Sequence, residues 1–330
     1  MKDTKEKIFI TGVGGMIGSH LLDALLLDGN YNVVGLDNFS FGKAENIASH
    51  WNDENFSLIE GDILDASLVR KAAEGADIVI HLAAVKKIAE ADSRLPTLLV
   101  NTKGTENILE AARDTGAKVI LASTSDVYGM SPDLPFREDG DLLLGPSMIK
   151  RWSYAVSKLY DEQLAFGYHK QYGLPIVVLR YFGGFSPRSS FKWSGGHIPI
   201  FVNAILNDEE VLIHGDGSQT RSMAYVTDLV RGTVQAMECD KAVGCIINLG
   251  NDEEVSVIEA ARMIHRIAGT GKELKIRYVP FDEVFGKYRD IMRRIPDLTR
   301  AREILGYRPE IPFEQALRLM VEAVRSGKDA

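Results

Sequence analysis

The sequence predicts an α/β protein with a doubly wound parallel sheet and a smaller, interleaved carboxyl-terminal lobe. Three observations support this fold class. Short runs rich in β-branched residues alternate with amphipathic stretches from the beginning of the chain. These runs are apolar throughout, as strands are when helices cover both faces of a parallel sheet. A glycine-rich turn joins the first run to the first amphipathic stretch.

The expected elements follow one another in a regular order. Helices are expected between most of the strands, since a parallel strand is usually reached through a crossing helix. Strands are predicted at 7–12, 31–37, 56–62, 77–84, 118–124, 175–181 and 245–250, and helices at 18–29, 67–75, 101–116 and 151–163.

The regular alternation loosens after Tyr181. The segment 182–199 is rich in glycine, serine and proline, and we expect it to open the smaller lobe. The run 245–250 again has the composition of a sheet strand, so the two lobes should interleave. We therefore predict a sheet domain over 1–181, to which a segment near 226–250 returns, and a smaller lobe over most of 182–330.

Composition narrows the class of function. The 330 residues are 45% hydrophobic and 25% charged, as in ordinary folded proteins. A net charge of −8 argues against nucleic acid or an anionic membrane as partner. Cys239 and Cys245 are too few for a disulfide framework, and no metal-binding spacing occurs. Because the chain enters a strand at once and has no long apolar run, we expect a cytoplasmic protein.

The first strand leads into a turn with glycines at 12, 15 and 18. Such a turn lets the backbone approach a pyrophosphate, while the following helix presents its free N–H groups to the phosphates. The second strand ends at Asp37, where a carboxylate can bind the ribose hydroxyls of NAD and would repel the extra phosphate of NADP. The sequence therefore predicts a Rossmann-like site that prefers NAD.

The ends of the next two strands also suit a dinucleotide. Asp62 and Ile63 end the third strand, near the expected position of adenine. Ala83 and Ala84 end the fourth strand, where small side chains would let a cofactor lie close. His81, inside that strand, is predicted to be a core residue rather than a ligand.

A candidate catalytic pair lies on the helix that begins near residue 151. Tyr154 and Lys158 are four residues apart and share a helix face. A lysine ammonium, together with a nicotinamide cation, would lower the pKa of the phenol. The tyrosine could then take a proton from a sugar hydroxyl while hydride leaves the same carbon. Thr124, at the end of the fifth strand, would hold that hydroxyl.

Taken together, the motifs of this chain resemble the extended short-chain dehydrogenases/reductases, specifically the nucleotide-sugar epimerases, dehydratases and decarboxylases. The resemblance covers almost the whole chain. Its motifs are TGVGGMIGSH, LDN, GDILD, HLAAVKKIAE, STSDVYG, YAVSK, LRYF, GDGSQTRSMAYVTDLV and RRIPDLTRAREILGYRP.

The resemblance implies NAD as cofactor, a UDP-linked nucleotide sugar as substrate, and a set of site residues. The catalytic residues would be Thr124, Tyr154 and Lys158. The cofactor would be bound by Gly12, Gly15, Met16, Ile17, Asp37, Asn38, Asp62, Ile63, Leu82, Ala83, Ala84, Lys86, Asn101, Tyr154, Lys158 and Tyr181. The substrate would be bound by Lys86, Thr124, Ser125, Asp126, Tyr154, Gly183, His197, Ile198, Arg221 and Asp290, with Arg221 on the diphosphate.

The motifs indicate two different reactions, epimerisation and decarboxylation. The segment around Lys86 and Glu90 resembles UDP-glucose 4-epimerases, as does LRYF. STSDVYGM and GPSMIKRWSYAVSK resemble UDP-glucuronate decarboxylases, which have Glu where this chain has Asp126. An asparagine that contacts the substrate diphosphate in many epimerases is replaced by Gly183. The sequence favours a 4-epimerase of a UDP-hexose or UDP-hexuronate acting through a 4-keto intermediate, with the decarboxylase as the alternative.

Two further alternatives are less favoured. A dehydratase would carry an Asp-Glu pair after the threonine, whereas this chain has Ser125 and Asp126. A non-catalytic NAD-binding regulator would not need Thr124, Tyr154 and Lys158. The resemblance also implies a homodimer in which the helix of Tyr154 and the helix that follows the segment LLVNTKG (98–104) pair with their copies. Leu159, Leu164 and Ala165 are expected to be available for this contact.

Overall fold

The computed structural model describes residues 5–86, 94–191, 196–281, 283 and 290–327. Its centre is a seven-stranded sheet with the order β11-β6-β5-β4-β1-β2-β3, and every neighbouring pair is parallel. The predicted fold class is confirmed. The strands are β1 (Glu6–Thr11), β2 (Tyr31–Asp37), β3 (Phe56–Glu60), β4 (Ile78–His81), β5 (Lys118–Thr124), β6 (Ile176–Tyr181) and β11 (Ile246–Leu249).

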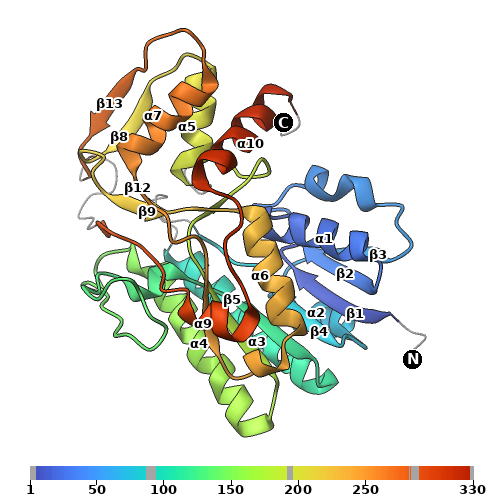
Figure 1. The fold of residues 1–330 in the computed structure, drawn as a ribbon. Coiled ribbons are helices and arrows are strands. Elements are labelled where there is room, and N and C mark those ends of the chain that lie inside the picture. The colour runs from blue at the N-terminus through green and yellow to red at the C-terminus, as the bar shows by residue number, and fades with distance from the viewer. Residues whose placement is uncertain (1–4, 87–93, 192–195, 282, 284–289, 328–330) are drawn as a thin grey trace.

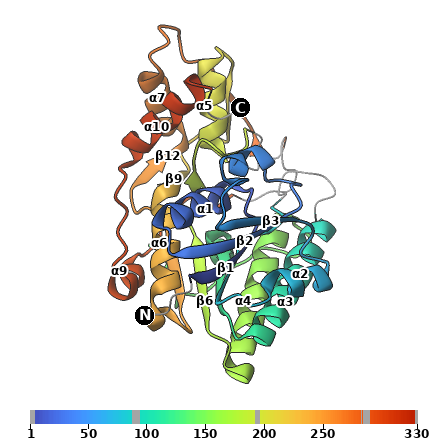
Figure 2. The same ribbon diagram turned by 90° about the vertical axis from the view of Figure 1, so that its right-hand side faces the viewer.

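Helices cover both faces of the sheet (Figure 2). One face carries α1 (Met16–Asp28) and α6 (Val226–Glu238), and the other carries α2 (Ala66–Ala73), α3 (Arg94–Thr115) and α4 (Trp152–Tyr172). Successive strand residues point to opposite faces. Accordingly, Ile8 and Ile10 belong to the core under α1, whereas Phe9 between them belongs to the core under α3.

The smaller lobe lies beyond the carboxyl ends of the strands (Figure 1). Its helices are α5 (His197–Leu206), α7 (Val257–Ala268) and α10 (Phe313–Arg325), and α9 (Thr299–Leu305) packs beside β11. Its short strands pair as β8 (Val211–His214) with β13 (Ile276–Val279), β9 (Thr220–Ser222) with β12 (Glu254–Ser256), and β7 (Gly184–Phe185) with β10 (Ala224–Tyr225). Short 3₁₀ helices occur at η1 (Ala44–His50), η2 (Ser125–Tyr128) and η4 (Asp240–Ala242).

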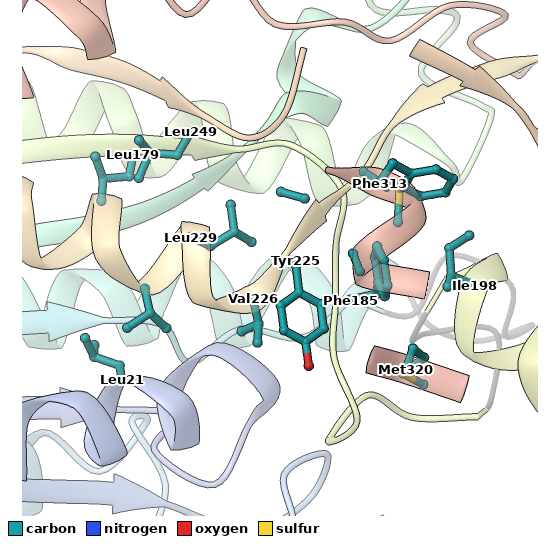
Figure 3. Close-up of a cluster of buried hydrophobic side chains, with 14 of the residues drawn as sticks. Leu21, Leu179, Phe185, Ile198, Tyr225, Val226, Leu229, Leu249, Phe313 and Met320 are labelled. Atoms are coloured by element: carbon teal, nitrogen blue, oxygen red, sulfur yellow. The ribbon is translucent and has the colours of Figure 1, made fainter. Parts of the chain in front are cut away.

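One hydrophobic core joins the α1 face of the sheet to the smaller lobe. It contains Leu21 of α1, Leu229 of α6, and Ile198 and Met320 of the lobe helices, and Figure 3 shows these side chains along one continuous path. The chain also returns to the main sheet through β11, which pairs with β6. The position of the smaller lobe over the strand ends is therefore held by buried apolar contacts.

The side chains expected at a dimer contact are placed differently. Ala165 is completely buried in the core, so the expectation that it is available was wrong, whereas Leu159 and Leu164 are only partly buried. The large apolar residues that are exposed on α3 and α4 are Leu95, Leu99, Val156, Tyr160 and Tyr172. In the described part of the chain, no helix is long and apolar enough to span a membrane.

Candidate active site

The glycine-rich turn brings the start of α1 close to the end of β4. Gly12 has a φ of +75°, and a Cβ there would lie 2.8 Å from the Ala83 nitrogen. A Cβ on Gly18 would lie 2.2 Å from the Gly12 carbonyl oxygen, so only glycine permits this helix–turn contact. Gly15 is the N-cap of α1 and caps it with no side chain. The turn and the helix start thus form a backbone surface suited to a pyrophosphate.

Asp37 ends β2 beside this turn. Its carboxylate accepts hydrogen bonds from the N–H groups of Gly14 (2.9 Å) and Phe39 (2.8 Å). Burial raises the pKa of Asp37, and these backbone bonds oppose the rise. Next to it, Asn38 donates to Asp62 (2.9 Å), so the residues predicted to meet the adenosine end share one edge of the sheet.

Several residues predicted to bind the cofactor make hydrogen bonds or packing contacts within the protein. Asn101 accepts from the Val85 N–H (2.7 Å) and donates to the Ser157 hydroxyl (2.9 Å), which ties the segment after β4 to α4. Tyr181 shares a hydrogen bond of 2.7 Å with Thr233. Ile63 is buried against Gly104. Met16 accepts a hydrogen bond from Ser189 (3.0 Å), a contact that the sequence did not predict. Ile17 and Leu82 are partly buried against the core.

The catalytic candidates come from β5 and α4. Thr124 is buried at the end of β5 and caps η2 by accepting the Asp126 N–H (3.2 Å). Lys158 is completely buried, and its Nζ lies 3.4 Å from Asp161. This Nζ has no hydrogen-bond partner among the described residues. A buried ammonium with unused donors, close enough to His81 at the end of β4 to lower the pKa of that imidazole, fits a ribose of a bound NAD.

The pKa of Tyr154 differs from the sequence expectation. Burial, followed by the negative charges of Asp126 and Asp161, raises it above its usual value. Since Asp161 neutralises Lys158, the protein alone does not lower the pKa of the phenol. A shift toward neutrality would therefore need the positive charge of an oxidised nicotinamide.

Asp126 is the centre of a buried charge cluster that the sequence did not predict. Its carboxylate lies 2.9 Å from Arg294, 3.2 Å from Arg151 and 3.9 Å from Lys86. Burial would raise the pKa of Asp126, but these cations hold it well below its usual range. Among the described residues, these three cations surround a single carboxylate. Lys86 also lies 5.6 Å from the ring centre of Tyr154, so this cationic cluster borders the tyrosine that the sequence predicts to be catalytic.

Arg221 and Asp290, both predicted to bind substrate, lie together. Arg221 donates to Asp290 (2.8 Å) and to the Ile291 carbonyl oxygen (2.7 Å). His197 is close enough that burial and the Arg221 charge lower its pKa to about 3. The Ile198 side chain is completely buried in the core, so a substrate contact there would have to use its backbone.

Two predicted substrate residues, Ser125 and Gly183, and one further residue of the motifs, Glu90, remain to be placed. Ser125 is buried in η2. Gly183 is covered by Met223, whose Sδ would lie 2.4 Å from a Cβ at that position. Glu90 lies outside the described residues. Arg151 and Arg294 are the functional candidates that sequence reasoning missed, although Arg151 begins the segment that contains Tyr154 and Arg294 lies in RRIPD.

Comparison with known proteins identifies the family. The sequence model of the GDP-mannose 4,6 dehydratase family matches residues 9–320. A UDP-N-acetyl-alpha-D-glucosaminuronate decarboxylase of Bacillus cytotoxicus is 38% identical over 97% of this chain and 98% of its own length. UDP-glucuronic acid decarboxylase 1 of Xenopus tropicalis is 35% identical over 97% of this chain and 72% of its own length.

Two solved structures that superpose on almost the whole chain are 4-epimerases by name. A UDP-glucuronic acid 4-epimerase of Bacillus cereus, in complex with UDP-glucuronic acid and NAD, superposes with a TM-score of 0.87 and 33% identity, over 97% of this chain and 99% of that one. A UDP-N-acetylglucosamine 4-epimerase of Methanobrevibacter ruminantium has a TM-score of 0.87 and 29% identity, over 98% and 99%. The chain belongs to the family of NAD-dependent nucleotide-sugar epimerases and dehydratases.

Proposed function

We propose that this protein is an NAD-dependent decarboxylase of a UDP-linked hexuronate. The observation that carries the proposal is the cationic cluster of Lys86, Arg151 and Arg294 beside Tyr154. The carboxylate of a hexuronate is an anion that Lys86, Arg151 and Arg294 can bind, whereas a neutral hexose offers them no negative charge. The similarity to hexuronate decarboxylases supports the same substrate class.

Each candidate residue would have a separate role in this reaction. Bound NAD would accept hydride from C4 of the sugar and return it later. Gly12, Gly15 and Asp37 would hold its phosphates and ribose, and the unused donors of Lys158 would hold the second ribose. Tyr154 would take the proton of the C4 hydroxyl, which Thr124 positions by a hydrogen bond.

Oxidation at C4 makes the loss of carbon dioxide possible. When the bond between C5 and the carboxylate carbon breaks, its electron pair forms an enolate. The negative charge of this enolate lies on the oxygen atom of the former C4 ketone. The protonated Tyr154 and Thr124 can donate hydrogen bonds to that oxygen, and the cationic cluster stabilises the negative charge that develops nearby. Protonation of C5 by water, followed by reduction of the C4 ketone with the Tyr154 proton returning to its oxygen, would then give a UDP-pentose.

A 4-epimerase of the same hexuronate is the second candidate. The motif around Lys86 and the structural likeness to a UDP-glucuronic acid 4-epimerase favour it. Both reactions share the C4 oxidation and the need to bind a carboxylate. They differ in whether the carboxylate leaves before hydride returns.

Product analysis separates the candidates. The protein would be incubated with UDP-glucuronate, UDP-N-acetylglucosaminuronate and UDP-glucose in turn, and followed by proton NMR and by release of carbon dioxide. A UDP-pentose with carbon dioxide supports the decarboxylase, and an epimeric hexuronate without carbon dioxide supports the epimerase. Turnover of UDP-glucose alone would contradict the role assigned to the cationic cluster.

The chain offers a matched pair of variants for the cluster. Arg294→Gln removes a cation that contacts Asp126, whereas Arg293→Gln removes the adjacent arginine, which is exposed and pairs with Glu254 (2.8 Å). Loss of a charged hydrogen bond typically costs about 1.5–3 kcal/mol. We expect Arg294→Gln to lower kcat/KM for the hexuronate by about tenfold to a hundredfold, and Arg293→Gln to leave it unchanged.

A further inference from the structure

Asp161 is a fully buried carboxylate one helical turn beyond Lys158. Its Oδ2 lies 3.4 Å from the Lys158 Nζ, and both side chains are shielded from solvent. Glu162, the next residue, is committed elsewhere, because it binds Arg180 through two hydrogen bonds of 2.9 and 2.7 Å. In the described part of the chain, Asp161 is therefore the carboxylate that balances the charge of Lys158.

A series of buried polar side chains lies beside this pair. Neither Asp161 oxygen has a hydrogen-bond partner among the described residues, but Thr105 of α3 is close enough to oppose the rise in its pKa. Thr105 in turn bonds His81 of β4 (3.0 Å), whose other ring nitrogen bonds Thr11 of β1 (2.7 Å). The Thr11 hydroxyl accepts the N–H of Ala83 (3.2 Å), next to Gly12. These hydrogen bonds thus run from α3, beside Asp161, to the cofactor end of the sheet.

Burial of the charged Lys158–Asp161 pair costs free energy, and packing alone does not need a charged pair. Burial raises the pKa of Asp161 to about 6, in spite of the opposing effects of Lys158 and Thr105. A buried carboxylate with a raised pKa weakens the folded state at neutral pH, because its charged form is disfavoured there. A side chain that only filled space would not require this charge.

We propose that Asp161 is a positioning residue that holds the Lys158 ammonium in the orientation that binds the nicotinamide ribose of NAD. The inference rests on the role proposed above for Lys158. The other ionisable groups that face the pair do not replace Asp161. His81 stays neutral because burial and Lys158 lower its pKa to about 3, Glu162 is paired with Arg180, and Tyr154 is protonated in the protein alone.

NAD binding, measured by calorimetry without any sugar, tests the inference. In the unaltered protein, protonation of Asp161 removes the charge that holds Lys158, so the affinity for NAD should fall by about tenfold between about pH 7.5 and about pH 5. Asp161→Asn should bind NAD about tenfold more weakly at pH 7.5 and lose most of this pH dependence. Its melting temperature at neutral pH should not fall.

Control variants separate the inference from more general effects. Asp228 is another fully buried aspartate that pairs with an arginine three residues later, Arg231, at 2.7 Å. Asp228→Asn should therefore keep the affinity and pH dependence of the unaltered protein. Asp161→Asn with unchanged NAD affinity would overturn the inference. If that variant does not fold, an affinity of the unaltered protein that is constant between these pH values would overturn it.

Lys158→Met distinguishes this inference from the proposed function. If Lys158→Met keeps full NAD affinity, the role proposed for Lys158 fails, and the inference fails with it. If Lys158→Met binds weakly and Asp161→Asn binds normally, only the role of Asp161 is wrong. Neither outcome depends on which sugar is the substrate.

Discussion

Replacing Gly183 by asparagine should destabilise the protein, and the cause should be Met223. A Cβ at residue 183 would lie 2.4 Å from the Met223 Sδ and 3.2 Å from its Cε, well inside normal contact distance. Met223 is itself buried, so it cannot move freely into solvent. Overpacking of this kind typically costs ~1–3 kcal/mol. We therefore expect Gly183→Asn to lower the free energy of unfolding by about 2 kcal/mol.

A double-mutant cycle tests the cause. Met223→Ala alone should also destabilise, by ~2–5 kcal/mol for a buried methionine. In the double variant the asparagine occupies the space that the methionine leaves, so the combined loss should be smaller than the sum by at least about 1 kcal/mol. Urea unfolding of the four proteins measures each free energy.

Gly167 provides the control for this cycle. It lies in α4, and a Cβ there would meet no atom within 4 Å. Gly167→Asn should therefore have little effect and should combine additively with Met223→Ala. If the losses for Gly183→Asn and Met223→Ala are also additive, within about 0.5 kcal/mol, then the packing of Met223 does not explain the glycine.

The remaining predictions concern chemistry, cofactor, pH and assembly. Tyr154→Phe should lower turnover by ~10²–10⁴ with an unchanged melting temperature, because it removes a proton acceptor but keeps the ring. Asp37 should make the thermal shift with NAD larger than with NADP, and equal shifts would contradict its role. Burial and Lys158 lower the pKa of His81 to about 3 from 6.5, so the unfolded chain binds more protons and the melting temperature should fall below pH 6.5. His81→Gln should show a smaller fall. Light scattering should find a dimer, and Tyr160→Glu on α4 should weaken it.

Much of the fold could be predicted from the sequence because its signals are local. Apolar runs predict buried parallel strands, and the glycines at 12, 15 and 18 indicate a turn that side chains would block. A carboxylate at the end of the second strand must lie beside that turn, since neighbouring parallel strands end at the same edge. Asp37 does so, through its bond to the Gly14 N–H.

Helix α4 shows where local signals become insufficient. Its sequence contains Tyr154, Lys158 and Asp161, but the helix is covered on several sides, so periodicity did not reveal which residues are exposed. Ala165 is consequently buried in the core rather than available to a partner, and Leu159 is partly buried. The pairing of Lys158 with Asp161, and the resulting pKa of Tyr154, depend on burial by α3 and the sheet.

The cationic cluster was decided entirely by tertiary structure. Lys86, Arg151 and Arg294 come from three distant parts of the chain and meet only because the carboxyl-terminal segment folds back over the strand ends. The same holds for Met223, which lies between β9 and β10 and covers Gly183. Sequence patterns determine backbone conformation over a few residues, whereas the electrostatics of a site are the sum of charges that packing brings together in a medium that screens them poorly.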